Sequence, residues 1–206
     1  YDHLIMMGKY NIPIVFFDRV PDLPNVHKVS SNIESGTREA IEFLIGKGHK
    51  RIGVINGPEE MGSCKDRIDT YVDVLKKKKI KIDLSLVVTT DLTEAGTWLA
   101  MESLLNLKHP PTAIVTINDY VALDAIQLAR KLKLKINKDI CFVSYANLPI
   151  SNYLEFPPLA SVEQYPYEQA KKATEILFDL INNKDKKEEI AYNNILIEGK
   201  LVAHKR

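Results

Sequence analysis

The sequence predicts an α/β protein built on a mainly parallel, doubly wound sheet. Short apolar runs that read as buried strands alternate with longer segments whose apolar residues recur at helical spacing. Polar residues directly follow several strands, as Asn56 follows the run 52–55 and Asn118 follows 113–117. Because ligands of open α/β sheets bind at the carboxyl ends of the strands, these polar groups mark the expected binding edge.

The predicted strands are short runs rich in β-branched and aromatic residues, bounded by turn residues. Gly48 precedes the third strand and is expected to adopt the left-handed conformation that ends a helix. Near the C-terminus, residues 195–197 and 200–203 are expected to form a hairpin or bent strand around Gly199. One sheet is predicted from 13–17, 26–30, 52–55, 86–89, 113–117 and 140–144.

Helices are predicted where apolar residues recur at intervals of three and four. Asn118 and Asp119 are suited to cap one of these helices. The stretch 145–160 contains three prolines and is expected to be irregular. The predicted helices cover 35–47, 66–78, 93–106, 119–132 and 167–182.

The composition is that of an ordinary globular protein and argues against several functional classes. The 206 residues, 45% of them hydrophobic, suffice for one large domain or two small ones. A net charge of +1 gives no whole-chain attraction to nucleic acid or to an anionic membrane. The two cysteines are far apart, which predicts neither a disulfide framework nor a metal site. No apolar run reaches the length of a membrane span.

Motifs for catalysis are absent from the sequence, which has no phosphate-binding loop, nucleophile elbow or two-histidine zinc motif. No cofactor is therefore predicted. What remains is a set of strand-end residues suited to a polyhydroxylated ligand, since Arg offers a rigid donor fork and Asn and Gln pair a donor with an acceptor. Taken singly, each is better explained as a cap or turn residue; together they favour a binding site. The set comprises Arg38, Asn56, Asp91, Asn118, Asp119, Asn147 and Gln164.

Several segments match, in order, the pattern of one known family. They include Ile12-Pro13-Ile14-Val15-Phe16-Phe17-Asp18-Arg19, Gly48-His49-Lys50-Arg51-Ile52-Gly53, Asn118-Asp119, Val143-Ser144-Tyr145 and Ser161-Val162-Glu163-Gln164. Over essentially the whole chain, the sequence resembles bacterial transcription regulators of the lactose repressor (LacI/GalR) family. The resemblance implies a type I periplasmic-binding-protein-like core of two subdomains, with an effector between them and a helix-turn-helix headpiece before them.

The resemblance also implies a truncated arrangement. The chain starts at Tyr1 in what reads as a helix, so it is expected to lack the headpiece and most of the first subdomain. Residues 1–164 and 189–206 would form the C-terminal, effector-binding subdomain, and 165–188 would belong to the otherwise missing N-terminal subdomain. The apolar face of helix 167–182 would then be uncovered, and is expected to dock on a neighbouring chain or to be poorly ordered.

Three ligand-binding residues follow from matching the family pattern. Arg38 matches an arginine that contacts sugar hydroxyls, Asn118 a ligand-binding asparagine, and Gln164 a glutamine of the cleft, with Asn147 nearby.

The sequence departs from that pattern at two positions of the expected ligand site. Ala146 stands where an aspartate is common, and Leu92, after Asp91, replaces the usual aromatic residue. These departures imply an effector other than the usual sugar, and they make an anionic effector less unfavourable.

The family's dimer interface falls on helix 119–132 and on part of the irregular stretch. An exposed apolar patch is therefore expected there, with a symmetric homodimer as its result. The alternative is that half of these residues cover the core. The residues are Val121, Leu123, Leu128, Leu132, Tyr153 and Leu154.

The leading interpretation is the effector-sensing and dimerisation region of a cytoplasmic regulator that contacts DNA only through a headpiece outside this chain. One alternative is a periplasmic sugar-binding protein of a transport system, which a signal peptide upstream of Tyr1 would identify. Another is an α/β enzyme acting on sugars, with Asp91 and Asp119 as an acid–base pair. The missing nucleophile, metal and phosphate motifs count against the enzyme.

Overall fold

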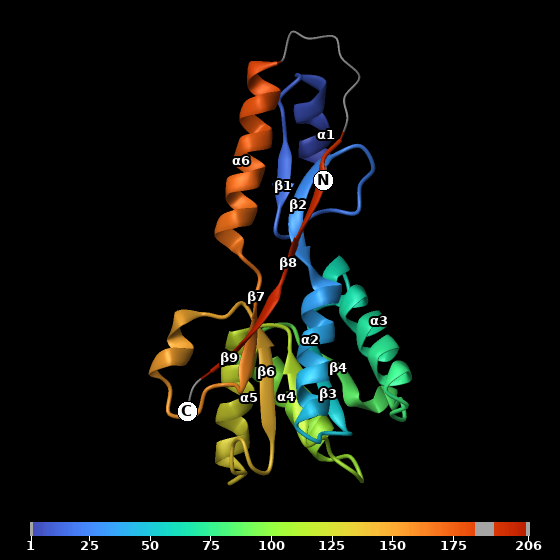
Figure 1. Cartoon of the computed structure of the whole chain (residues 1–206), viewed down its shortest axis with the longest axis vertical. Helices are drawn as coiled ribbons and strands as arrows, with labels where there is room; N and C mark the ends of the chain where they lie inside the picture. Colours follow the sequence, from blue (N-terminus) through green and yellow to red (C-terminus); the bar gives the residue numbers. More distant parts are fainter. Residues whose placement is uncertain (1, 184–191, 205–206) are drawn as a thin grey trace. The chain divides into compact units, whose positions relative to one another are not determined.

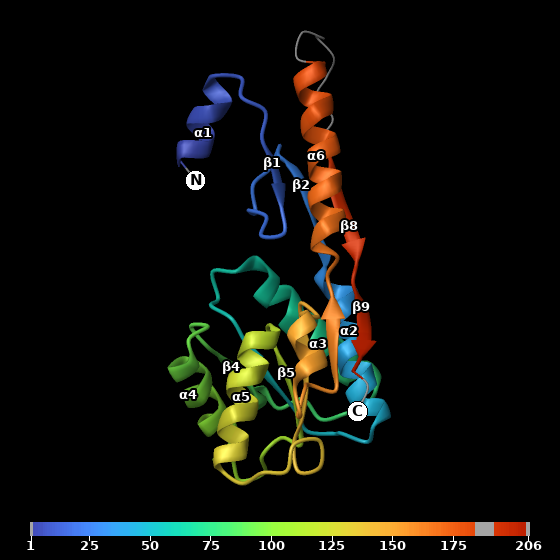
Figure 2. The same cartoon turned by 90° about the vertical axis from the view of Figure 1, so that its left-hand side faces the viewer.

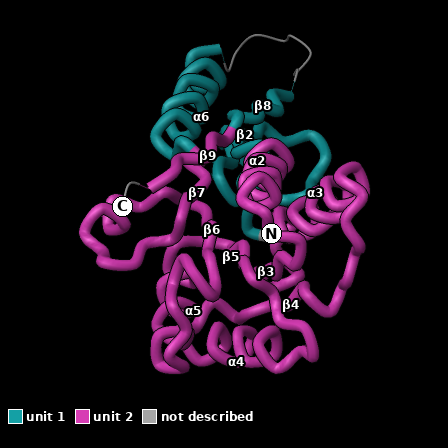
Figure 3. The backbone as a smooth tube through the Cα atoms, turned by 60° about the horizontal axis from the view of Figure 1, so that its bottom comes forward, with its two compact units in different colours: residues 1–32, 165–198 teal, residues 33–164, 199–206 magenta. Residues whose placement is uncertain are grey.

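Two separate sheets organise the computed structural model, which describes residues 2–183 and 192–204 (Figure 1). Unit 1 contains residues 1–32 and 165–198, and unit 2 contains 33–164 and 199–206 (Figure 3). The prediction of one sheet is therefore wrong, because the first two strands belong to unit 1. The division also differs from the predicted one, since residues 1–32 lie with the helix that follows residue 165.

Unit 1 has a three-stranded parallel sheet in the order β1-β2-β8, with helix α6 packed along it (Figure 2). Val29, Ala173 and Ile176 form its small core. The apolar face of α6 is thus covered by strands of the same chain, and the expectation of an uncovered face is wrong. The elements are α1 (Asp2–Lys9), β1 (Val15–Phe17), β2 (His27–Asn32), α6 (Pro166–Asn182) and β8 (Asn194–Glu198).

Unit 2 has a six-stranded sheet in the order β4-β3-β5-β6-β7-β9, in which only β9 runs antiparallel to its neighbour. Of the two arrangements predicted around Gly199, the hairpin is wrong and the bent strand is correct, because β8 pairs with β2 in unit 1 and β9 continues directly to pair with β7 in unit 2. The strands are β3 (Ile52–Asn56), β4 (Val87–Thr89), β5 (Ala113–Thr116), β6 (Cys141–Tyr145), β7 (Ala160–Glu163) and β9 (Lys200–Ala203).

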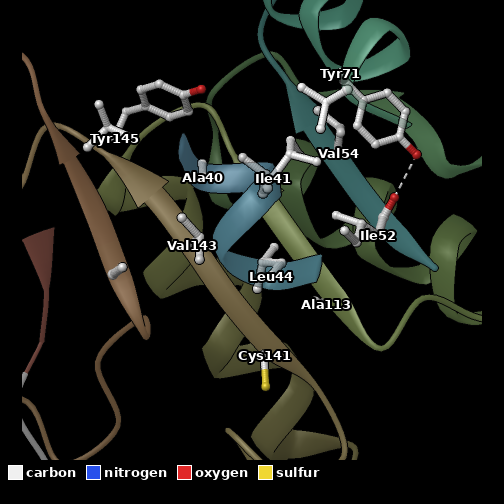
Figure 4. Packing of buried hydrophobic residues seen from close by; sticks show 14 of the residues in the cluster. Ala40, Ile41, Leu44, Ile52, Val54, Tyr71, Ala113, Cys141, Val143 and Tyr145 are labelled. Atoms are coloured by element: carbon white, nitrogen blue, oxygen red, sulfur yellow. Dashed lines mark hydrogen bonds between the residues drawn. The ribbon is translucent and has the colours of Figure 1, made fainter. Parts of the chain in front are cut away.

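Helices cover both faces of the unit 2 sheet, as predicted for a doubly wound fold. Two apolar cores result, one beneath α2 and α3 and the other beneath α4 and α5. In the first core the Tyr71 hydroxyl donates a hydrogen bond of 2.9 Å to the Ile52 carbonyl, and burial raises the pKa of Tyr71 to about 12 (Figure 4). The helices are α2 (Ile33–Gly46), α3 (Gly62–Lys77), α4 (Glu94–Leu105) and α5 (Asp119–Lys131), with short 3-10 turns η1 (Leu84–Leu86) and η2 (Pro149–Tyr153).

Two local predictions from the sequence are confirmed. Gly48 follows α2 with a φ of 93°, a conformation that glycine adopts without strain. Asn118 caps α5, because its side-chain oxygen accepts a hydrogen bond of 2.9 Å from the backbone N–H of Val121. Gly48 lies between the end of α2 and β3, and Asn118 lies between β5 and the start of α5. Asn118 is therefore at the carboxyl edge of the sheet.

Candidate functional site

The carboxyl ends of five parallel strands of unit 2 form one continuous edge, here called the effector edge. Strand order places the loop after β4 first, then the end of β3, and then the loops after β5, β6 and β7. Most predicted site residues lie on these loops, so the topology brings them together as expected. In strand order they are Asp91 and Leu92, Asn56, Asn118, Ala146 and Asn147, and Gln164.

A buried arginine lies at the centre of the effector edge. Arg67, on α3, is only 4% exposed, and its Nη1 donates hydrogen bonds of 3.4 Å to Asn56 Oδ1 and to the Ser63 carbonyl. Its guanidinium carbon lies 4.5 Å from the centre of the Tyr145 ring, a favourable cation–π contact. Its Nε is buried and has no hydrogen-bond partner within the described residues. A buried guanidinium N–H that lacks an acceptor is costly, which favours an acceptor supplied by a ligand.

Neighbouring side chains hold this arginine in place. Asn56 Nδ2 donates 2.9 Å to the Cys64 carbonyl, which fixes the orientation of the amide. Thr37 donates to the Ile33 carbonyl at 2.7 Å, so the hydrogen bond of 2.6 Å between Thr37 and Tyr145 is donated by the tyrosine hydroxyl. Burial raises the pKa of Tyr145, which therefore stays a neutral donor. The Tyr145 ring is thus locked against the Arg67 guanidinium.

The predicted ligand arginine, Arg38, has a different environment. Its guanidinium donates to Glu34 at 2.7 Å and to Asp73 at 3.0 Å, and hydrogen bonds from these two groups raise its pKa. The pKa of Asp73 is lowered by hydrogen bonds from Lys77 and Arg38. Arg38 therefore ties α2 to α3, and its positive charge is already balanced by two carboxylates.

A buried carboxylate at the start of α5 connects strands β6 and β7 and the loop after β6. Asp119 is fully buried and accepts hydrogen bonds from the Ser144 hydroxyl, from the Ser161 hydroxyl at 2.8 Å, and from the Leu148 backbone N–H at 2.6 Å. These bonds connect the start of α5 to β7 and to the loop after β6. Asp119 thus positions the loop that carries Ala146 and Asn147.

That loop has an unusual backbone. Ala146 has a φ of 94° and Asn147 a φ of 48°, both in the left-handed region that favours glycine. The Ala146 N–H bonds the Val162 carbonyl at 3.0 Å, and Asn147 Nδ2 donates 3.0 Å to Glu163 Oε2. Strain of this kind persists where surrounding contacts fix the backbone, and it clusters at ligand sites.

This strain leads to a stability prediction. The variant Ala146→Gly should raise the free energy of unfolding by about 1 kcal/mol, because relief of the strain exceeds the entropy cost of glycine. Urea denaturation measures the change. Ala95→Gly, at an exposed position of α4, is the matched control and should lower stability by about 0.5–1 kcal/mol. An equal loss in both variants would show that Ala146 is unstrained.

Asp91 and Leu92 form a tight turn before α4. Asp91 Oδ1 accepts hydrogen bonds from Thr93 Oγ1 at 2.6 Å and from its backbone N–H at 3.0 Å, which lower the pKa of Asp91. Leu92 packs against the core beneath α4 and α5. Asp91 thus accepts hydrogen bonds within its own turn, whereas Asp119 accepts them from Ser144, Ser161 and the Leu148 N–H.

The predicted dimer residues fall into two groups. Val121 and Leu128 are 1% and 6% exposed in the core of unit 2, so the expectation that they belong to an exposed patch is wrong. Helix α5 packs against the sheet on one side and against α4 on another, so residues on more than one face of the helix are buried. Leu132 and Tyr153 are exposed, and Leu123 and Leu154 line a hollow of about 510 Å³ beside Phe156.

In the described part of the chain, no group of three or more His, Cys, Asp or Glu residues is arranged to hold a metal ion. None of its helices is long and apolar enough to cross a membrane.

Comparison with known proteins identifies the class. The family described as periplasmic binding protein-like domain matches residues 41–202. The HTH-type transcriptional repressor CytR of Escherichia coli (strain K12) is 36% identical over 159 residues, 77% of this chain and 45% of the relative. The HTH-type transcriptional repressor PurR of Aliivibrio salmonicida is 31% identical over 173 residues, 84% of this chain and 52% of the relative. The chain thus spans about half the length of these curated relatives.

Solved structures give the same result. A regulatory protein of the LacI family from Chloroflexus aggregans superposes with a TM-score of 0.83 at 30% identity, covering 96% of this chain and 69% of the other. A complex of the transcriptional regulator CelR with cellobiose gives a TM-score of 0.86 at 26% identity, covering 96% and 60%. The chain belongs to the family of periplasmic binding protein-like domains, in the form found in regulators of the lactose repressor type.

Proposed function

We propose that this chain is the effector-binding region of a cytoplasmic transcription regulator and takes a small polar ligand at the effector edge. The observation that carries the proposal is the buried Arg67, whose Nε has no partner among the described residues. The likeness to named transcriptional repressors supports a regulatory role, and the CelR complex with cellobiose supports a sugar-like ligand. Control of DNA would pass through a helix-turn-helix that lies outside this sequence.

Arg67 takes the role that the family resemblance gave to Arg38. A guanidinium held by Asn56 and the Tyr145 ring is preorganised, so a ligand oxygen gains a charge-assisted hydrogen bond without losing side-chain entropy at that residue. Arg38 would have to leave two carboxylates to do the same. Around Arg67, the loops carrying Asn118, Asn147 and Gln164 supply the polar rim, and Leu92 offers aliphatic contact.

The charge of the effector edge determines whether neutral or acidic ligands are favoured. Ala146 places no carboxylate where the family often has aspartate, so Arg67 keeps an uncompensated positive charge in a low-dielectric setting. A neutral sugar uses the Arg67 N–H groups as donors, whereas a phosphorylated or carboxylated sugar also gains Coulomb attraction. We propose a polyhydroxylated effector, with an acidic group tolerated.

A ligand screen tests this proposal. Thermal unfolding of the chain is followed with mono- and disaccharides, including cellobiose, and with sugar phosphates. A ligand that binds only the folded state raises the unfolding temperature as its concentration rises above Kd. At least one polyhydroxylated compound should do so, and aromatic amines without hydroxyl groups should not. A screen in which no polyhydroxylated compound shifts the transition contradicts the proposed ligand class.

We also propose a homodimer through the exposed surface of α5 and η2. Its apolar side chains Leu123, Leu154 and Phe156 flank a shallow hollow, and Tyr153 beside it is 87% exposed. Arg130 stacks 5.0 Å from the Phe156 ring centre, which gives the hollow a polar rim typical of interfaces.

A charge placed in this surface should weaken the dimer at least roughly tenfold, because an unpaired carboxylate would be desolvated. The variant is Leu123→Glu, and sedimentation equilibrium at tens of micromolar measures association. Leu84→Glu, at a position 63% exposed in η1, is the matched control and should leave association unchanged. A monomeric parent chain would contradict the dimer, and a dimer that both variants leave intact would place the interface elsewhere.

A further inference from the structure

A second hollow of about 620 Å³ lies in unit 2, at the edge of the sheet opposite the effector edge. Its walls come from the end of α2, the loop before β6, and the ends of β7 and β9 that meet there. Phe43 and Leu159 form an apolar part of the lining. The basic residues of the lining are Lys47, His49, Lys138 and His204.

The ionisable groups that line this hollow include lysines and histidines but no carboxylate. No aspartate or glutamate is among its lining residues, and neither Lys47 nor Lys138 forms an ion pair with any described residue. Lys47 Nζ lies 4.8 Å from the Phe43 ring centre, so its charge is held at the apolar wall. Burial, and then the charge of Lys47, lower the pKa of His49. Like charges therefore gather here without the carboxylates that balance Arg38 in the same unit.

The two histidines are held in fixed orientations. His49 Nδ1 lies 2.9 Å from Thr112 Oγ1, which anchors the ring between α2 and β5. His204 Nδ1 lies 2.9 Å from the Pro158 carbonyl, and because a carbonyl only accepts, this nitrogen carries the proton. The hollow thus combines two lysine cations with two preoriented imidazoles.

An unsatisfied polar atom marks the same place. Asn137, in the wall beside Lys138, has a buried Oδ1 without a hydrogen-bond partner in the part of the chain that is described. Its Nδ2 donates a hydrogen bond of 3.4 Å to the Pro157 carbonyl. This bond fixes the orientation of the amide and leaves the amide oxygen without a partner among the described residues. A ligand hydroxyl would satisfy that oxygen while an acidic group meets the lysines.

We propose that this hollow is a second ligand site, which binds a small phosphate ester. The phosphate oxygens accept hydrogen bonds from Lys47 and Lys138, with His49 adding a donor when protonated. The organic part lies against Phe43 and Leu159, and this apolar contact separates an ester from inorganic phosphate. The residues that line the hollow differ from those of the effector edge, although a hydrogen bond joins the two places, because His204 Nε2 lies 3.4 Å from Asn147 Oδ1.

Nuclear magnetic resonance titration of the 206-residue chain with phenyl phosphate tests the proposal, with inorganic phosphate and phenol as comparison ligands. Phenyl phosphate should give saturable shifts at His49, Lys138 and their neighbours, and its binding should raise the pKa of His49. Inorganic phosphate should bind more weakly to the same residues, and phenol should give no saturable shifts.

Paired variants provide the decisive comparison. Lys47→Gln combined with Lys138→Gln should weaken phenyl phosphate binding roughly tenfold, because two charge-assisted contacts are lost. Lys76→Gln, an exposed lysine of α3 outside the hollow, removes the same kind of charge and should leave the affinity within about twofold. Unchanged affinity in the paired variant, absence of saturation, or shifts that gather at Arg67 and Asn118 instead would each overturn the site. The last result would leave the proposed effector edge intact.

Discussion

Replacing Arg67 by methionine should reduce the affinity for the effector by roughly 10- to 150-fold, the equivalent of about 1.5–3 kcal/mol for a lost charge-assisted hydrogen bond. Methionine keeps a long unbranched side chain and removes the donors, the charge and the cation–π contact with Tyr145. Calorimetric titration with whichever compound the thermal screen identifies measures the change.

Two companion variants make this result specific. Arg67→Lys keeps the charge but loses the planar donor fork, and should recover only part of the affinity. Arg38→Ala should change affinity less than about threefold, because Arg38 is paired with Glu34 and Asp73 on the surface. A large loss in Arg38→Ala together with near-normal binding in Arg67→Met would return the role to Arg38.

Replacing Asp119 by alanine should lower the free energy of unfolding by about 3–5 kcal/mol. The substitution leaves the Leu148 N–H and the Ser144 and Ser161 hydroxyls without their buried acceptor, and each such loss costs roughly 1–3 kcal/mol. The hydroxyls can rotate to other acceptors, which keeps the total below the full sum. Equilibrium denaturation in urea measures the change.

The matched control is Glu102→Ala, at an exposed carboxylate of α4, which should change stability by no more than about 0.5 kcal/mol. The loop after β6 should also become more mobile in Asp119→Ala, with faster amide exchange at Leu148. If the two variants are equally stable, Asp119 does not hold the loops together.

Most of the order of helices and strands could be predicted from the sequence because it depends on local periodicity, but β7 (Ala160–Glu163) was missed. Each of the six predicted strands corresponds to an observed one, and the caps at Gly48 and Asn118 follow from local chemistry. Sheet membership is not local. Strand β2 pairs with β8, which lies more than 160 residues later in the chain, so that Lys28 is opposite Asn194. Neither segment has a local sequence feature that predicts this pairing.

The residues of the candidate site that follow strands were predicted from the sequence. The one that lies within a helix was missed. Asn118 and Asn147 follow strands, so the sequence places them at the effector edge. Arg67 lies in mid-helix, four residues before Tyr71, on the buried face of α3. A charged residue at an apolar position of a helical repeat was the available signal. The resemblance drew attention to Arg38 instead, whose partners Glu34 and Asp73 only the fold reveals.

In the proposed function, the effector accepts a hydrogen bond from the Nε of Arg67, which has no partner among the described residues. Two-dimensional nitrogen–proton spectra of the arginine side chains follow this N–H group directly during titration with the compound found by screening. The Arg67 Nε–H signal should shift saturably at the calorimetric Kd, while the Arg38 signal stays within its scatter. A saturable shift at Arg38 with an unmoved Arg67 signal would show that Arg38, and not Arg67, contacts the effector.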